Sequence, residues 1–470
     1  MSHLFKIALL FFVLAACTEQ GGSPSPSSPP AGDTNKAETP QPSARPLTLL
    51  LLPMESSGAM YERFLPLKYH IEKALGVPVE LRIARDYETA ITDIGSGRVH
   101  IACLDPATYC EVRARYRERI QPLVKALGRE GASSRSVLVA KSGSGIEKIV
   151  DVRGKKLALG NERSSFSYLI PLALLLDVGI GMKDLAAVDY LNQEDRIALS
   201  VLIGNHDVGG ISESVARKYL ADGLKIIKAS EAIPQFFFCS TDMVGGDQKK
   251  EIARILSSLG DKAVLSSIDK DIERFAAAED RDFDVVRVMI RNTTGRDYLE
   301  YGPRSVRVAV LPLYSAITIY DRYEPLMRYL SKRTGREFKL VIPKDFEDFM
   351  RVVKGRKAEF SYQNPYIFAL IDKEVDIRPL VTTVDDTSES EDRPGQQDSF
   401  RGVIITRDDS RLKNVKDLRN KRVMIVSRKS AGGYLSQKLF FAQMGIDVDK
   451  EMRIVDAKRQ ETVILGVYKG

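Results

Sequence analysis

The sequence predicts an α/β protein made of two tandem copies of one domain, the second of them incomplete at its C-terminal end. Two observations support this prediction. The chain aligns with itself over most of its length, and each half alternates short apolar strands with amphipathic helices. Such alternation is typical of parallel sheets covered by helices. At 470 residues the chain has room for both cores.

The internal repeat holds in two registers. In the first, Pro53 matches Pro312, which lies 259 residues further on. The same offset pairs Leu52 with Leu311, Tyr61 with Tyr320, Gly76 with Gly335, and Pro106 with Pro365. In the second register the offset is 266 residues, which pairs Asp151 with Asp417, Ser164 with Ser430, Tyr168 with Tyr434, and Gly204 with Gly470. The extra residues of the second register fit the polar loop 385–398 of the second copy. Because the period is about 260 residues, each repeat is a domain rather than a solenoid unit.

These matches set the domain boundaries that we expect. Residues 47–292 form a complete domain (copy 1), residues 293–305 are a connector, and residues 306–470 form an incomplete domain (copy 2). Each copy opens with a strand, a helix ended by glycine, and a second strand. The expected strands are 47–52, 79–83 and 155–159 in copy 1, and 306–311, 338–342 and 422–426 in copy 2. The first helices are expected at 61–75 and 320–334, with Asp86 and Asp345 as N-caps of the next helices.

The N-terminus carries a targeting signal. Lys6 precedes a short apolar run, and the tetrad Leu14-Ala15-Ala16-Cys17 resembles the bacterial lipobox, in which the cysteine is diacylated and becomes the mature N-terminus. An ordinary secretory signal with a chance cysteine is the alternative. Residues 1–16 are therefore expected to be a lipoprotein signal peptide, and the Ser/Pro-rich residues 17–46 a flexible tether. The mature protein is expected in the periplasm or at the cell surface, anchored to the membrane through Cys17.

Composition argues against several classes of function. The net charge is +7, but 70 basic and 63 acidic residues are interspersed, so no nucleic-acid partner is expected. Besides Cys17 the chain holds Cys103, Cys110 and Cys239, which we expect to be buried free thiols. The three histidines after the signal form no spaced pair, so no metal is expected. Catalytic motifs are absent from the sequence, so neither an enzyme nor a cofactor is expected.

A serine-rich turn is the best candidate for a binding site. It spans residues 160–168 in copy 1 and 427–434 in copy 2, and in both it leads from a strand into a helix. A helix N-terminus offers unpaired N–H groups and a partial positive charge, which together hold anions. Serine hydroxyls add further donors. The alternative is that these serines only cap the helix, as serine often does.

The chain resembles the phosphonate-, phosphite- and phosphate-binding proteins that serve ABC importers. The resemblance rests on Leu52-Pro53 with Tyr61, on Ile101–Tyr109, on Asp151–Leu157 before the turn, and on the late run Phe275–Arg287. It covers copy 1 almost from end to end. It implies a type 2 periplasmic-binding-protein fold, in which two α/β lobes close on a small oxyanion ligand, and an ABC permease as partner.

The family's Ser-Thr-Ser-Gly-Tyr turn grips phosphonate oxygens with hydroxyl and N–H groups. By position, Ser164 keeps the first serine, Ser165 stands for the threonine, Phe166 replaces the second serine, and Ser167 replaces the glycine. In copy 2 only Ser430 survives. Each lost hydrogen bond to a charged ligand costs about 1.5–3 kcal/mol. The clamp is therefore expected to be weaker in copy 1 than in the family, and weaker still in copy 2.

A second departure concerns charge. Where the family usually places a histidine, copy 1 has Glu194 and copy 2 has Gln460. A carboxylate repels a bound phosphonate unless it is protonated or bridged by a cation. His206 is a candidate replacement donor, the alternative being a solvent-facing turn. The remaining candidate ligand-binding residues are Tyr61 and Asp105 in copy 1, and Tyr320, Asn364 and Tyr366 in copy 2, the aligned Tyr61 and Tyr320 being equally good packing residues.

Copy 2 ends at the residue that matches Gly204, so it lacks a counterpart of residues 205–292. We therefore expect exposed strand edges and a poorly formed cleft in copy 2, and any ligand to bind copy 1. The resemblance implies a solute-binding lipoprotein that captures a small oxyanion for an ABC importer. The alternative is a ligand-sensing or accessory module that is not coupled to transport.

Overall fold

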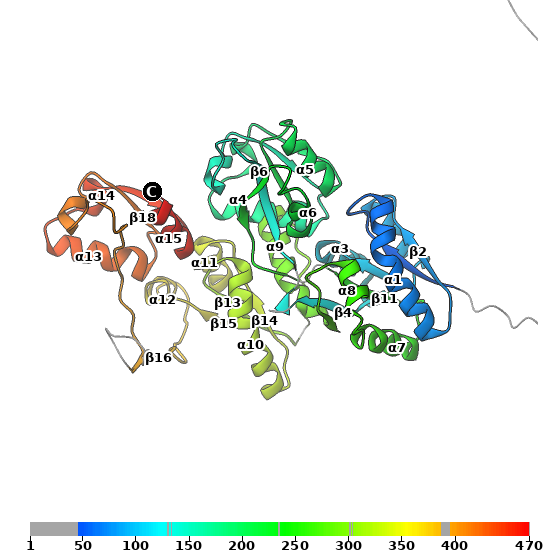
Figure 1. The fold of residues 1–470 in the computed structure, drawn as a ribbon. Helices are drawn as coiled ribbons and strands as arrows, with labels where there is room; N and C mark the ends of the chain where they lie inside the picture. Colours follow the sequence, from blue (N-terminus) through cyan, green and yellow to red (C-terminus); the bar gives the residue numbers. More distant parts are fainter. Residues whose placement is uncertain are drawn as a thin grey trace, which may run out of the picture. The chain divides into compact units, whose positions relative to one another are not determined.

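The order of helices and strands repeats along the chain, as Figure 1 shows. The computed structural model describes residues 46–128, 131–132, 134–233, 236–299, 302, 304–386 and 395–469. The expected signal peptide and all of the tether except Pro46 lie outside the described residues. Within the described part, no helix is both long and apolar enough to cross a membrane.

Copy 1 has two sheets, which define its first and second lobes. The first-lobe sheet has the order β12-β4-β11-β3-β1-β2, with β5 paired to β4. Its strands are β1 (Leu47–Leu51), β2 (Val79–Ile83), β3 (Ile101–Leu104), β4 (Ile120–Gly128), β5 (Gly131–Ala132), β11 (Phe237–Thr241) and β12 (Arg274–Ala277). The second-lobe sheet has the order β10-β6-β9-β7-β8. Its strands are β6 (Ser136–Lys141), β7 (Lys156–Leu159), β8 (Ala187–Tyr190), β9 (Val208–Ser212) and β10 (Leu224–Ala229).

Helices cover both sheets of copy 1. In the first lobe they are α1 (Ser57–Leu75), α2 (Tyr87–Gly95), α3 (Pro106–Tyr116), α7 (Gly246–Ser257) and α8 (Lys262–Ile268). In the second lobe they are α4 (Ile170–Asp177), α5 (Glu194–Leu202) and α6 (Glu213–Lys218), which lie around β6 in Figure 1. The run resembling the family's late signature forms β12 and the start of α9 (Asp284–Thr294). The three cysteines of this copy are buried free thiols, which confirms that prediction.

Copy 2 repeats the first part of this plan. Its sheet β14-β13-β15 has the same order as β2-β1-β3, and the parallel pair β18-β19 matches β7-β8. The strands are β13 (Val306–Val310), β14 (Phe338–Val341), β15 (Phe360–Tyr362), β18 (Arg422–Ile425) and β19 (Arg453–Asp456). The helices are α10 (Ala316–Thr334), α11 (Phe346–Lys354), α12 (Pro365–Asp372), α13 (Ser436–Gln443), α14 (Val448–Glu451) and α15 (Gln460–Lys469). The polar loop 385–398 carries a short pair, β16 (Asp385–Asp386) and β17 (Gln396–Gln397).

The first helix of each copy starts four residues before its predicted position. Ser56 caps α1 by accepting the N–H of Ala59, and Ser315 caps α10 by accepting the N–H of Thr318. The predicted glycine ends are confirmed, because Gly76 follows α1 with a positive φ of 68°, a conformation that glycine adopts without strain. The cap decides where a helix begins, and the apolar periodicity used for the prediction starts only inside it.

The strands of copy 2 have fewer partners than their counterparts in copy 1. β3 lies between β1 and β11, whereas β15 pairs only with β13 among the described residues. β6 lies between β9 and β10, whereas the matching residues 402–407 form no strand. Val403 there is 70% exposed. The expectation of exposed strand edges is therefore confirmed for the described residues of copy 2.

Candidate functional site

The serine turn has the same backbone form in both copies. In copy 1 the Ser164 Oγ accepts hydrogen bonds from the Ser167 N–H (3.2 Å) and from the Ser167 hydroxyl (2.8 Å). In copy 2 the Ser430 Oγ accepts from the Gly433 N–H at 3.0 Å. Each serine caps one π-helical turn, Ser165–Leu169 or Ala431–Leu435, that leads into α4 or α13. π-Helical turns are rare and frequently lie at functional sites.

The end of β7 leaves no spare room beside the turn in copy 1. The Gly160 N–H donates to the Ser167 carbonyl at 2.8 Å, and a Cβ at Gly160 would overlap the Ser167 side chain. The Phe166 carbonyl accepts the Ser136 hydroxyl at 2.5 Å. Phe166 and Ser167 are therefore part of a tightly packed wall, and both are buried.

Asp105 lies on the turn of copy 1 from the opposite lobe. It is the N-cap of α3, with its Oδ1 accepting the Ala107 N–H at 2.8 Å. The same oxygen accepts the Ser165 hydroxyl at 2.8 Å, and Oδ2 accepts the Ser165 N–H at 2.8 Å. Asp105 is only 2% exposed. Burial raises the pKa of Asp105 to about 6, although the donated hydrogen bonds act in the opposite direction.

Two further residues of α3 contact the same turn. The Thr108 hydroxyl donates to the Arg163 carbonyl at 3.1 Å, and Glu111 accepts the Arg163 Nε–H at 2.8 Å. With Asp105, these residues follow one another at helical spacing along one face of α3. We call this set of three side chains the latch, since it joins the first lobe to residues 163–165 of the second.

Glu194 adds a second buried carboxylate to copy 1. It begins α5 and is 5% exposed, with Oε2 accepting the N–H (2.9 Å) and the hydroxyl of Ser212. Burial raises the pKa of Glu194 to about 7, and the nearby carboxylates of Glu55 and Asp105 act in the same direction. Glu55 is itself buried and forms ion pairs with Arg63 and Lys218.

The structure does not bring His206 or Tyr61 to the turn. The Nδ1 of His206 lies 2.6 Å from the Ser200 Oγ, and its Nε2 lies 2.8 Å from the Asp189 carboxylate. These two hydrogen-bond partners explain how His206, which follows α5, can be buried. Tyr61 is 44% exposed on α1.

In copy 2 both carboxylates are replaced by amides. Asn364, at the position of Asp105, caps α12 by accepting the Ile367 N–H at 3.0 Å on its Oδ1. Its Nδ2 is buried and has no hydrogen-bond partner in the described part of the chain. Gln460, at the position of Glu194, begins α15, and its N–H donates to the Leu313 carbonyl at 3.2 Å. The Glu194 N–H approaches the Met54 carbonyl in the same way at 3.5 Å, so the framework is conserved between copies.

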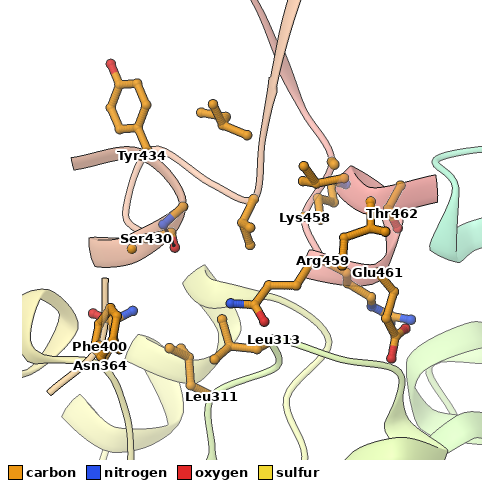
Figure 2. Close-up of a pocket in the computed structure, with 18 of the residues that line it drawn as sticks. Leu311, Leu313, Asn364, Phe400, Ser430, Tyr434, Lys458, Arg459, Glu461 and Thr462 are labelled. Atoms are coloured by element: carbon orange, nitrogen blue, oxygen red, sulfur yellow. Dashed lines mark hydrogen bonds between the residues drawn. The ribbon is translucent and has the colours of Figure 1, made fainter. Parts of the chain in front are cut away.

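The turn of copy 2 opens onto a large hollow. Ser430 and Asn364 line it with Leu311, Leu313, Phe400 and Lys458, and its volume is about 2540 Å³. Figure 2 shows Ser430 near Asn364 and Phe400, with Lys458 on a neighbouring segment. Small-molecule sites commonly measure roughly 300–1,000 Å³, so this hollow extends well beyond a ligand site. Unpaired apolar residues such as Val403 also line it.

Two candidate tyrosines of copy 2 lie elsewhere. Tyr320 lies on α10, and its hydroxyl donates a hydrogen bond to the Arg281 carbonyl at 2.6 Å. Tyr366, on α12, is not among the residues that line the hollow. Sequence reasoning missed Lys458, which does line it and has a positive φ of 65°. Its aligned partner Asn192 has a φ of 61°, so the repeat contained the signal for this turn.

These features define a class of protein: tandem two-lobed α/β domains of the type 2 periplasmic-binding kind, with a capped turn between the lobes. The chain belongs to the family of periplasmic substrate-binding proteins of phosphonate ABC transporters. A sequence model of that family matches residues 49–283 and 308–470, one segment in each copy. The tandem duplication and the family resemblance are thus confirmed. Members of this family are solute-binding components of transporters.

The chain is also similar to individual proteins and solved structures. The chain is 26% identical over 216 residues to the phosphate-import protein PhnD of Mycolicibacterium smegmatis, covering 42% of this chain and 67% of that protein. A binding protein of an ABC phosphonate transporter from Pseudomonas aeruginosa aligns with a TM-score of 0.48 at 18% identity, covering 62% of this chain and 97% of that one. PhnD1 of Prochlorococcus marinus, in complex with methylphosphonate, aligns with a TM-score of 0.47 at 18% identity, covering 52% and 97%.

Proposed function

We propose that this chain is an extracytoplasmic solute-binding lipoprotein that captures a small oxyanion of the phosphonate, phosphite or phosphate class for an ABC importer. The observation that carries the proposal is the capped π-helical turn at Ser430, which opens onto a hollow that Asn364 also lines. The amide nitrogen of Asn364 is buried and has no hydrogen-bond partner among the described residues. The family membership and the phosphate-import relative support the same ligand class.

The chemistry of this turn suits an oxyanion. The first N–H groups of a helix have no partner within the helix and carry its positive end, so they attract an anion. An unpaired buried polar group costs about 1–3 kcal/mol, and a ligand oxygen that accepts from the Asn364 Nδ2 would remove that cost. Lys458 supplies a positive charge on the same hollow.

Binding to the full-length chain tests this proposal. Isothermal titration with phosphate, phosphite, methylphosphonate and sulfate is expected to show binding of one of the first three. Ser430→Ala and Asn364→Ala are expected to weaken it at least tenfold. Ser331→Ala is the matched control, because its hydroxyl donates to the Met327 carbonyl inside α10, and it should leave affinity unchanged. Absence of binding by every oxyanion would refute the ligand class.

The membrane anchor is a separate part of the proposal. The lipobox-like tetrad and the polar tether after it support acylation of Cys17. In bacterial cells the wild-type chain is expected in the membrane fraction and Cys17→Ser in the soluble extracytoplasmic fraction. A Cys17→Ser chain that still sediments with membranes would contradict the anchor.

A further inference from the structure

We propose that copy 1 is held shut by its own carboxylate: Asp105 acts as an internal ligand of the Ser165 turn and excludes oxyanions from this cleft. The oxyanion site of the chain is then in copy 2. The assignment to copy 2 rests on the proposed function, whereas the internal contact of Asp105 does not. The sequence alone favoured copy 1 as the binding half, and the contacts below reverse that preference.

The first argument is that both donors of Ser165 are already used. The N–H and hydroxyl of Ser165 both donate to Asp105, at 2.8 Å each. A carboxylate presents two oxygens and a negative charge, as one face of a phosphonate does. An incoming oxyanion would therefore have to displace Asp105 from these same donors.

Capping of α3 does not account for these contacts. An N-cap aspartate needs only local bonds, such as the bond of Asp105 to the Ala107 N–H. Asp86, the N-cap of α2, accepts from Thr89 and otherwise bonds its neighbour Arg85. Asp105 instead reaches Ser165 across the two lobes. The hydrogen bonds of Asp105 to Ser165 therefore hold the two lobes together and are not needed to cap α3.

The second argument is charge. Glu194 is buried near Asp105. Glu55 lies in the same interior, but its ion pairs with Arg63 and Lys218 compensate its charge. Like charges at short range in a desolvated site disfavour each other strongly, so Asp105 and Glu194 oppose entry of an anion.

The third argument is that copy 2 has lost the whole latch at aligned positions. Asp105 becomes Asn364, Thr108 becomes Ile367, and Glu111 becomes Leu370. On the turn, Ser165 becomes Ala431. These changes remove the groups that tie α3 to the turn in copy 1. They leave the cap of α12 by Asn364 intact, and within the described ranges the Asn364 Nδ2 has no hydrogen-bond partner.

Hydrogen exchange tests the internal contact without any ligand. In the full-length chain, Asp105→Ala is expected to speed amide exchange in the peptide 164–169 at least tenfold. The control Asp261→Ala removes the N-cap of α8 in the same lobe, and it should leave this peptide unchanged. Ser165→Ala and Thr108→Ala, which keep the α3 cap, should give smaller accelerations in the same peptide. Equal exchange in wild type, Asp105→Ala and Ser165→Ala would overturn the proposal.

Titration with methylphosphonate and inorganic phosphate tests the assignment to copy 2. The wild-type chain is expected to bind one oxyanion, and Asn364→Asp, which installs the residue of copy 1, should abolish this binding. Asp105→Asn combined with Glu194→Gln, which installs the residues of copy 2, should add a second site. Binding that survives Asn364→Asp and is lost in Ser164→Ala would overturn the assignment. If no variant binds an oxyanion, the proposed function fails, while the exchange experiment still decides on the internal contact.

Discussion

The buried carboxylates of copy 1 make a quantitative prediction about pH and stability. Burial raises the pKa of Asp105 to about 6 and that of Glu194 to about 7. In an unfolded chain such groups titrate near pH 4. A raised folded-state pKa means that the folded chain binds protons more tightly than the unfolded one. The stabilisation is therefore fully present below about pH 4 and is lost as the pH rises through 6 to 7.

The size of the effect follows from these shifts. Between pH 5 and pH 8 the free energy of unfolding of copy 1 should fall by roughly 1 kcal/mol from Asp105 and roughly 3 kcal/mol from Glu194. Asp105→Asn with Glu194→Gln removes both titrations. The variant should therefore lose about 4 kcal/mol of the pH dependence that the wild type shows over this range.

The positions of the cysteines allow the unfolding of copy 1 to be measured separately. Cys103, Cys110 and Cys239 are buried free thiols of that copy, and copy 2 contains no cysteine. In a Cys17→Ser background, urea unfolding followed by pulsed thiol labelling gives the free energy of unfolding of copy 1. Measurements at pH 5 and pH 8 are compared between wild type and the double variant. Asp177, whose pKa is also raised by burial, is present in both chains and contributes equally to both. If the wild type and the double variant show the same pH dependence, Asp105 and Glu194 are not its source and the reasoning is refuted.

The same labelling assay checks two further predictions. Gly160→Ala should destabilise copy 1 by about 1–3 kcal/mol, because the new Cβ overlaps Ser167. Gly58→Ala, which has open space around its Cβ, should not destabilise it. Equal unfolding midpoints for the two variants would contradict the packing described. Arg63→Met should destabilise copy 1 by about 3 kcal/mol, because it leaves the buried Glu55 with one cation fewer. A change in the free energy of unfolding below about 0.5 kcal/mol, which is the scale of exposed ion pairs, would show that Glu55 is solvated.

Much of the fold could be predicted from the repeat. Two registers of matching residues gave the tandem organisation, and the glycines after α1 and α10 gave the helix ends. Helix starts were less accurate, because the capping serines Ser56 and Ser315 precede the apolar pattern.

The site was predictable only in part. The turn at Ser164 and Ser430 was visible, because serine before a helix is a local signal. The bonds between Asp105 and Ser165 were not, since they join two lobes that the chain visits sixty positions apart. The aligned change from Asp105 to Asn364 was present in the sequence. Interpreting this change required the structure. There Asp105 accepts hydrogen bonds from Ala107 and Ser165, whereas the Asn364 Nδ2 has no partner in the part of the chain that the structure describes.

The most direct test of the account is a crystal structure of the full-length chain grown with methylphosphonate. The account predicts a tetrahedral group at the turn of copy 2, within hydrogen-bond distance of the Ser430 hydroxyl and the Asn364 Nδ2, with Asp105 still bonded to Ser165 in copy 1. A phosphonate bound at Ser165, with Asp105 displaced, would contradict it.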